Sequence, residues 1–126
     1  PARIGGCLMI VSAGIAQLAE KCNTKDKTNS HYSIGNAWKI FKSDRKKHSS
    51  PNAAQTESAC AGALKVALSG DNYYFGKLVH KPQIGEAIRP LEAGDIGRSN
   101  ILLYITAFLM VIIVLLIRLI IMLAVR

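Results

Sequence analysis

The sequence contains few cysteines and few acidic residues. Its three cysteines are Cys7, Cys22 and Cys60, an odd number with no C-x-x-C spacing. This pattern predicts neither a disulfide framework nor a zinc site. The eight Asp and Glu residues are outnumbered by 16 Lys and Arg, which gives a net charge of +8. The charge alone is compatible with nucleic-acid binding, but a basic loop beside a membrane accounts for it equally well, and we predict no nucleic-acid partner.

The common nucleotide-binding and catalytic motifs are also absent. The sequence has no Walker A motif, no G-x-G-x-x-G, no H-E-x-x-H and no G-x-S-x-G. Phosphate-binding loops, dinucleotide folds, zinc proteases and serine hydrolases built on these patterns are therefore excluded. If the chain handles a nucleotide, it does so by another arrangement.

The hydrophobic residues, half of the chain, are unevenly distributed. Residues 101–125 are almost wholly apolar and contain one charge, Arg118. A helix of this length reaches about 37 Å, which is enough to cross a bilayer. We therefore predict a transmembrane helix. Residues 4–19 are uncharged and rich in small residues that allow close helix packing. They predict a second membrane-associated helix, with a signal peptide as the alternative.

The region between the two apolar segments is polar and basic. Residues 20–99 hold 13 Lys and Arg against eight Asp and Glu, which favours the cytoplasmic side of a membrane. The predicted fold is an all-α polytopic helical membrane protein with a cytoplasmic helix-and-loop region. We expect a membrane-associated helix at 1–19, a linker at 20–33, cytoplasmic motif-bearing helices and a loop at 34–99, and the transmembrane helix at 100–126.

Two helices are predicted inside the polar region. The first is capped by Ser33, and its apolar stripe consists of Ile34, Ala37, Trp38 and Phe41 at helical spacing.

The second helix is predicted to begin at Ser50–Pro51, where Ser can cap and Pro lacks only an N–H that the first turn does not need. It should run to Leu68 and end at Ser69–Gly70. Residues 70–94 contain prolines and glycines and predict a structured loop. Asp95 is then expected to cap the transmembrane helix.

The stretch DRKKHSSPNAAQTE, residues 44–57, concentrates charge in front of the second helix. Free N–H groups at a helix N-terminus attract phosphate, and neighbouring Arg and Lys add charge-assisted hydrogen bonds. Asn52 can donate to a carboxylate or phosphate, and Asp44 or Glu57 can hold magnesium or act as a base. The alternative is a basic run that contacts acidic lipid. The candidates in this stretch are Asp44, Arg45, Lys47, His48, Ser50, Asn52 and Glu57.

A second candidate group follows a turn. Tyr73, Tyr74 and Phe75 stand close in sequence to His80 and Lys81. Aromatic rings beside a turn can stack on a planar ligand. The alternative is an aromatic belt at a membrane interface.

Three strings occur in a fixed order before the terminal span: DRKKHSSPNAAQTESACAGAL, SGDNYYFGKLVHKPQIG and IRPLEAGDI. Together they resemble the C-terminal part of the cobalamin-biosynthesis membrane protein family, the adenosylcobinamide-phosphate synthases. The resemblance covers nearly the whole chain, apart from residues 21–30. One departure is Ser69, which stands where we expect a second glycine beside Gly70.

The resemblance implies a multi-pass membrane ligase that joins aminopropanol or its phosphate to adenosylcobyric acid, with ATP and Mg²⁺ as activating partners. It also implies that this chain is a C-terminal fragment whose function needs further N-terminal membrane helices. The alternatives are a regulatory or sensory membrane protein of the same superfamily and a lipid-binding membrane anchor.

The roles that follow from the resemblance are these. His48 and Glu57 are the catalytic candidates, with Arg45, Lys47 and His48 around phosphate and Asp44 as metal ligand or base. Ser50, Asn52 and Lys81 are further binding candidates, and Tyr73 and Tyr74 are expected against the corrin or nucleotide.

Overall fold

The described part of the chain is mostly helical, as predicted, and also contains four short strands that were not predicted. The computed structural model describes residues 1–23, 30–48, 50 and 52–125, without the side chain of Tyr74. Because strands lie between the third and fourth helices, the all-α class is not confirmed. The elements are α1 Ala2–Asn23, α2 Ile34–Asp44, α3 Ala53–Leu64, β1 Leu68–Ser69, β2 Asn72–Tyr74, β3 Lys77–Val79, β4 Gln83–Ile84 and α4 Gly94–Ala124.

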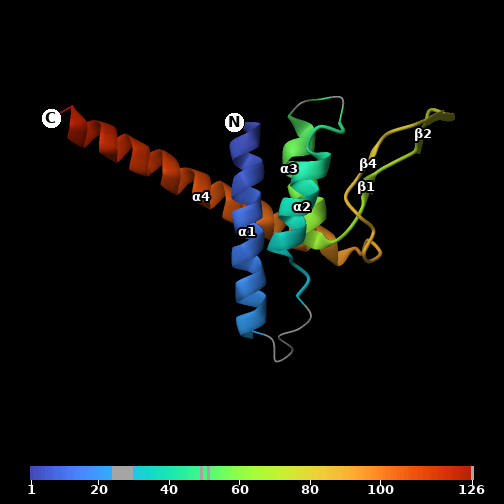
Figure 1. Ribbon diagram of the computed structural model, residues 1–126, viewed down its shortest axis with the longest axis horizontal. Coiled ribbons are helices and arrows are strands. Elements are labelled where there is room, and N and C mark those ends of the chain that lie inside the picture. The colour runs from blue at the N-terminus through green and yellow to red at the C-terminus, as the bar shows by residue number, and fades with distance from the viewer. Residues whose placement is uncertain (24–29, 49, 51, 126) are drawn as a thin grey trace.

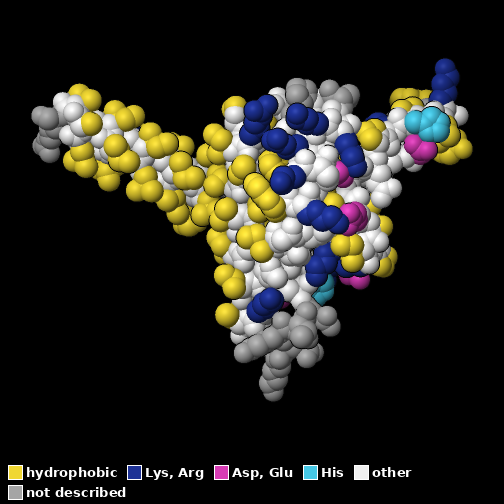
Figure 2. All heavy atoms as spheres, in the orientation of Figure 1, with side chains coloured by type: hydrophobic (Ala, Val, Ile, Leu, Met, Phe, Trp, Pro, Cys, Tyr) yellow, Lys and Arg dark blue, Asp and Glu magenta, His cyan; other side chains and the backbone are white. Residues whose placement is uncertain are grey.

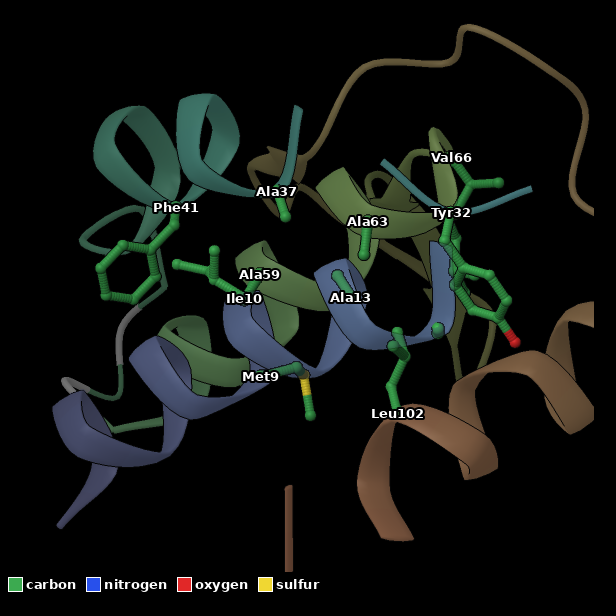
Figure 3. Close-up of a cluster of buried hydrophobic side chains, with 12 residues drawn as sticks. Met9, Ile10, Ala13, Tyr32, Ala37, Phe41, Ala59, Ala63, Val66 and Leu102 are labelled. Atoms are coloured by element: carbon green, nitrogen blue, oxygen red, sulfur yellow. The ribbon is translucent and has the colours of Figure 1, made fainter. Parts of the chain in front are cut away.

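The first three helices form the body of the molecule, and α3 packs against both α1 and α2. Figure 1 shows α2 running opposite to its two neighbours, with the α2–α3 connection near the N-terminal end of α1. The core between them combines alanines and aliphatic side chains with the aromatic rings of Phe41 and Tyr32, as Figure 3 shows. They include Ile10 and Ala13 of α1, Ala37 and Phe41 of α2, Ala59 and Ala63 of α3, and Leu102 of α4.

Close helix packing is clearest at Gly62 of α3. A Cβ atom at this position would lie 2.7 Å from the Asn36 carbonyl oxygen and 2.8 Å from the Ala37 Cα. The side chain of Asn36 donates to the Gly62 carbonyl at 2.9 Å. The alanine- and glycine-rich sequence of α3 therefore lets its backbone lie directly against α2.

The structure confirms the predicted cap of α2 and revises its buried face. Ser33 is the N-cap, and its hydroxyl accepts from the Asn36 amide. Ala37 and Phe41 are buried, whereas Trp38 is 52% exposed. The buried face continues through Ile40 to Asp44, and Trp38, which was predicted on this face, lies beside it.

Helix boundaries differ from the prediction at three places. Helix α1 continues to Asn23, four residues past the predicted end at Ala19. Helix α3 has Asn52 as its N-cap and ends at Leu64, because Lys65 adopts a left-handed conformation with φ of 59°. The predicted start at Ser50 and end at Leu68 were wrong. Pro51 and residues 24–29, the centre of the predicted linker, lie outside the described residues.

Residues 66–85 form a narrow β-ribbon where the sequence predicted a structured loop. Strand β1 pairs with β4 and β2 pairs with β3, both antiparallel. The β2–β3 turn places Phe75 and Gly76 at positive φ, as a two-residue hairpin turn requires. Ser69 also has a positive φ of 63°, which explains why the resemblance led us to expect glycine there.

Helix α4 crosses α1 and then extends away from the body (Figure 1). Both α1 and α4 are long and apolar enough to cross a membrane, and none of the most apolar part of α4 is buried. The two helices are joined where the hydroxyls of Ser12 and Thr106 lie 2.9 Å apart. Ala93 is the N-cap of α4, so Asp95 lies in the first turn and is not the predicted cap.

Candidate functional site

Six of the predicted site residues lie in one segment between α2 and α3, which we call the basic corner: Asp44, Arg45, Lys47, His48, Ser50 and Asn52. Helix α2 ends at Asp44 and α3 begins after Asn52. Figure 2 shows Lys and Arg side chains gathered over this end of the body, in contrast to the apolar surface of α4.

Asp44 is the buried residue of the basic corner, with an exposed fraction of 3%. Its Oδ1 lies 2.8 Å from the Lys47 ammonium, and its Oδ2 accepts from the Gly85 amide at 2.9 Å. Burial raises the pKa of the Asp44 carboxyl, but the hydrogen bonds from Lys47 and Gly85 outweigh it and hold the pKa below its ordinary value. The ionised carboxylate therefore ties the end of α2 to the β-ribbon.

The cations of the basic corner are held in different ways. The Lys47 side chain is about half exposed and pairs with Asp44. The Arg45 guanidinium stacks on the Phe41 ring at 5.5 Å, and the Arg45 carbonyl accepts from the Gln55 side chain at 3.3 Å. A guanidinium placed in this way keeps its N–H groups available in a fixed plane, which suits phosphate or carboxylate.

The geometry also assigns a tautomer to His48. Its Nδ1 accepts from the Ser50 amide at 3.0 Å, so a neutral imidazole must carry its proton on Nε2. In this form His48 offers a hydrogen-bond donor, and not a base, to a bound group. Asn52 is exposed and its side chain makes no cap hydrogen bond. The structure therefore brings together several donors beside the start of α3.

Glu57 lies away from the basic corner, in a groove of about 620 Å³ between α3 and α4. Its carboxylate has no hydrogen-bond or ion-pair partner within the described part of the chain. The groove also contains the half-buried Cys60, and burial raises the pKa of its thiol to about 11. Cys60 is therefore a protonated, unreactive thiol at neutral pH.

The aromatic group stands on the β2–β3 hairpin, apart from the basic corner. Tyr73 is 71% exposed on β2, and Lys81 is exposed beyond β3. Figure 1 shows this hairpin projecting away from α2 and α3. The Tyr74 side chain lies outside the described residues. The chain thus does not bring the tyrosines next to the predicted phosphate-binding residues.

Sequence reasoning missed a second ionic cluster where α4 begins. Arg89 makes two hydrogen bonds to the Asp95 carboxylate, and its Nε donates to the Leu64 carbonyl at 3.0 Å. Arg98 bonds the same carboxylate at 2.8 Å and Glu92 at 3.1 Å. The alternating charges of the string IRPLEAGDI were a signal for this cluster, which fixes the first turn of α4 against the end of α3.

No group of three or more His, Cys, Asp or Glu side chains among the described residues is arranged to hold a metal ion. Both oxygens of Asp44, the predicted metal ligand, already have protein partners. The described residues thus do not fit a magnesium site of their own.

These features define a mostly helical chain with two helices of membrane-spanning length and a basic corner between two of its helices. The profile of the CobD/Cbib protein family matches residues 1–103, and the match falls on the C-terminal part of that family. The chain therefore belongs to the CobD/Cbib family.

Individual relatives agree with this assignment. The chain is 43% identical over 118 residues to the cobalamin biosynthesis protein CobD of Clostridium perfringens, covering 94% of this chain and 33% of that protein. It is 48% identical over 87 residues to CobD of Desulfotalea psychrophila, covering 69% and 26%. It is 38% identical over 109 residues to CbiB of Salmonella typhimurium, covering 86% and 30%. The chain thus spans about a third of the length of these relatives, and no solved structure matches it.

Proposed function

We propose that this chain forms part of an enzyme of corrinoid biosynthesis that joins aminopropanol or its phosphate to a carboxylate of adenosylcobyric acid. The observation that carries the proposal is the family match over residues 1–103, with relatives that are named cobalamin biosynthesis proteins. The reaction belongs to the amide-forming ligases, and ATP supplies the phosphoryl group that activates the carboxylate.

In this proposal the basic corner binds phosphate. Arg45 contributes an oriented guanidinium, His48 donates from Nε2, and Asn52 donates beside the start of α3. The supporting observations are the Arg45–Phe41 stacking and the Ser50–His48 hydrogen bond. Such donors are already in place before the reaction, so they can stabilise negative charge as it develops. Because the described residues supply no metal cluster, we derive no step through Mg²⁺.

Amide formation requires the amine nitrogen to attack the activated carbonyl carbon while phosphate leaves. An amine that arrives as an ammonium must first lose one proton to free its lone pair, which needs an acceptor within reach. The proton that the nitrogen loses after the attack leaves with the phosphate. Glu57 is the candidate acceptor, because its carboxylate has no partner among the described residues. His48 is not suited to this role in the tautomer described, and its role is in phosphate binding.

We further propose that the protein lies in the cell membrane with the basic corner on the cytoplasmic side. Helix α4 would contact the lipid bilayer or further membrane helices, because its apolar surface has no cover in the described structure. The relatives are about three times as long as the matched region, and we expect full activity to need helices that correspond to the rest of their length.

Complementation tests this function. The chain is expressed alone, and also joined to the N-terminal part of a relative, in a bacterium that lacks the synthase. We expect the joined form to restore growth that depends on corrinoid made from cobyric acid. Failure of both forms, with both inserted in the membrane, would argue against the ligase.

The basic corner and the uncovered apolar surface of α4 favour one other candidate function, a membrane anchor that binds anionic lipid. The two candidate functions differ in whether they depend on the positions of particular side chains. In the ligase, His48→Ala or Asn52→Ala abolishes cobinamide formation while the protein stays inserted. In the anchor, only the number of Lys and Arg residues matters, so exchanging their positions has no effect.

A further inference from the structure

The groove between α3 and α4 differs chemically from the basic corner. Both helices pack on α1 and touch each other little, so a space of about 620 Å³ opens between them. This volume lies within the range of about 300–1,000 Å³ typical of small-molecule sites. Most of its surface is apolar, from Met9, Leu64, Leu91, Ile96 and Leu103 among others.

Among the residues that the structure describes, no Lys, Arg or His lines this groove. Two of its acids are already neutralised, since Asp95 is bound by Arg89 and Arg98, and Glu92 by Arg98. Glu57 is therefore the carboxylate left for a ligand in the described part of the groove. An apolar surface with a negative charge and no cation disfavours ATP and any phosphorylated amine.

The groove also offers uncharged hydrogen-bonding groups, from Thr56, Ser99 and Asn100. We propose that this groove binds the edge of the corrinoid substrate and that Glu57 receives the ammonium of the incoming amine. The inference rests on the proposed function. A corrinoid presents a large ring edge with methyl groups and neutral amides, which matches apolar walls with neutral polar groups.

Helix α3 connects the two sites. Asn52 is its N-cap at the basic corner, and Glu57 lies five residues further, about 7.5 Å along the helix axis. In this arrangement, a carboxylate on the part of the ring outside the groove extends past the start of α3 to a phosphoryl group at the basic corner. The amine, attracted by Glu57, would approach the same carboxylate from the groove side.

The test uses the joined protein, purified in detergent, and measures binding of cobyric acid by equilibrium dialysis from its visible absorbance. Leu103→Trp fills the groove from α4, at a position 54% exposed, so the larger side chain is not forced into the core. Leu119→Trp is the matched control, 46% exposed on the same helix and outside the groove. We expect Leu103→Trp to weaken binding at least about tenfold and Leu119→Trp to leave it unchanged.

Glu57→Gln tests the proposed amine site separately from the binding of the corrinoid ring. We expect this variant to bind cobyric acid like the parent and to raise the KM for the amine by about tenfold or more. Equal binding by the parent and Leu103→Trp, with complementation intact, would overturn the groove proposal and leave the ligase standing. An unchanged KM in Glu57→Gln would remove Glu57 from the amine site. A joined protein that neither binds cobyric acid nor complements would overturn the proposed function, and the groove proposal with it.

Discussion

The contact at Gly62 makes a sharp prediction about how α3 is held. In Gly62→Ala the added Cβ would lie 2.7 Å from the Asn36 carbonyl oxygen, 2.8 Å from the Ala37 Cα and 2.9 Å from the Ile40 Cβ. Two of these atoms belong to the α2 backbone, which cannot move aside as a flexible side chain does. Overpacking of this kind destabilises by about 1–3 kcal/mol.

Alanine also has a higher helix propensity than glycine, so part of that loss is offset. Gly35→Ala measures this gain alone, because a Cβ at Gly35 meets nothing within 4 Å on the exposed side of α2. We expect Gly35→Ala to be neutral or stabilising by roughly 0.5–1 kcal/mol. The net loss in Gly62→Ala is then expected to lie between about 0 and 2.5 kcal/mol, so the comparison with Gly35→Ala decides the test.

The assay is denaturant titration in detergent micelles, followed by the fluorescence of Trp38. This residue is the single tryptophan, and it stands on α2 with its ring 6.3 Å from that of Phe41. The difference in unfolding free energy between the two variants isolates the packing contribution. If Gly62→Ala proves as stable as Gly35→Ala, α3 does not lie directly against the α2 backbone and our account of the packing is wrong.

Three further predictions concern single contacts. Because the folded pKa of Asp44 is lowered, its contribution to stability is present above the unfolded pKa and is lost as pH falls through the folded pKa. Asp44→Asn should remove this acid-dependent loss and reduce the free energy of unfolding at pH 7 by about 1–3 kcal/mol. Unfolding measured from pH 7 to the acid limit tests both expectations. Ser69→Gly should stabilise the protein by about 1 kcal/mol, because φ at Ser69 is 63°; a decrease in thermal midpoint would contradict this. Ser12→Ala should lose about 0.6 kcal/mol through its bond to Thr106, whereas the same change at Ser99, which bonds only its own helix, should have less effect on unfolding.

The sequence predicted best what depends on local pattern. Ser33 was identified as a cap because a short hydroxyl side chain before an apolar stripe satisfies the first free N–H groups. The apolar run at 101–125 indicated a long helix because it contains one charge, Arg118, and no proline or glycine interrupts it. The family resemblance was confirmed by the profile match over residues 1–103.

The sequence predicted poorly what depends on distant neighbours. Trp38 belongs to an apolar stripe in the sequence. Helix α3 contacts the adjacent face of α2 instead, so the Trp38 side chain remains half exposed. The role of Asp44 depends on Gly85, 41 residues away, which no local pattern reveals. The ribbon was missed because strands of two or three residues have too few positions to show an alternating pattern.

The site predictions divide in the same way. Residues that were close in sequence, from Asp44 to Asn52, form one corner because the α2–α3 connection is short. Glu57 follows only five residues later, but the turn of the helix directs it into the groove. The assignment of catalytic and binding roles stays a prediction until the variants are measured.

The cluster of Arg89, Asp95 and Arg98 has a mechanical consequence. These groups hold the first turn of α4 to the body, and the Arg89 side chain is anchored to the end of α3. These contacts therefore fix the orientation of the long apolar helix relative to the body and oppose its rotation about its own axis. If α4 lies in a bilayer, this connection would also set the direction in which the groove faces relative to the lipid.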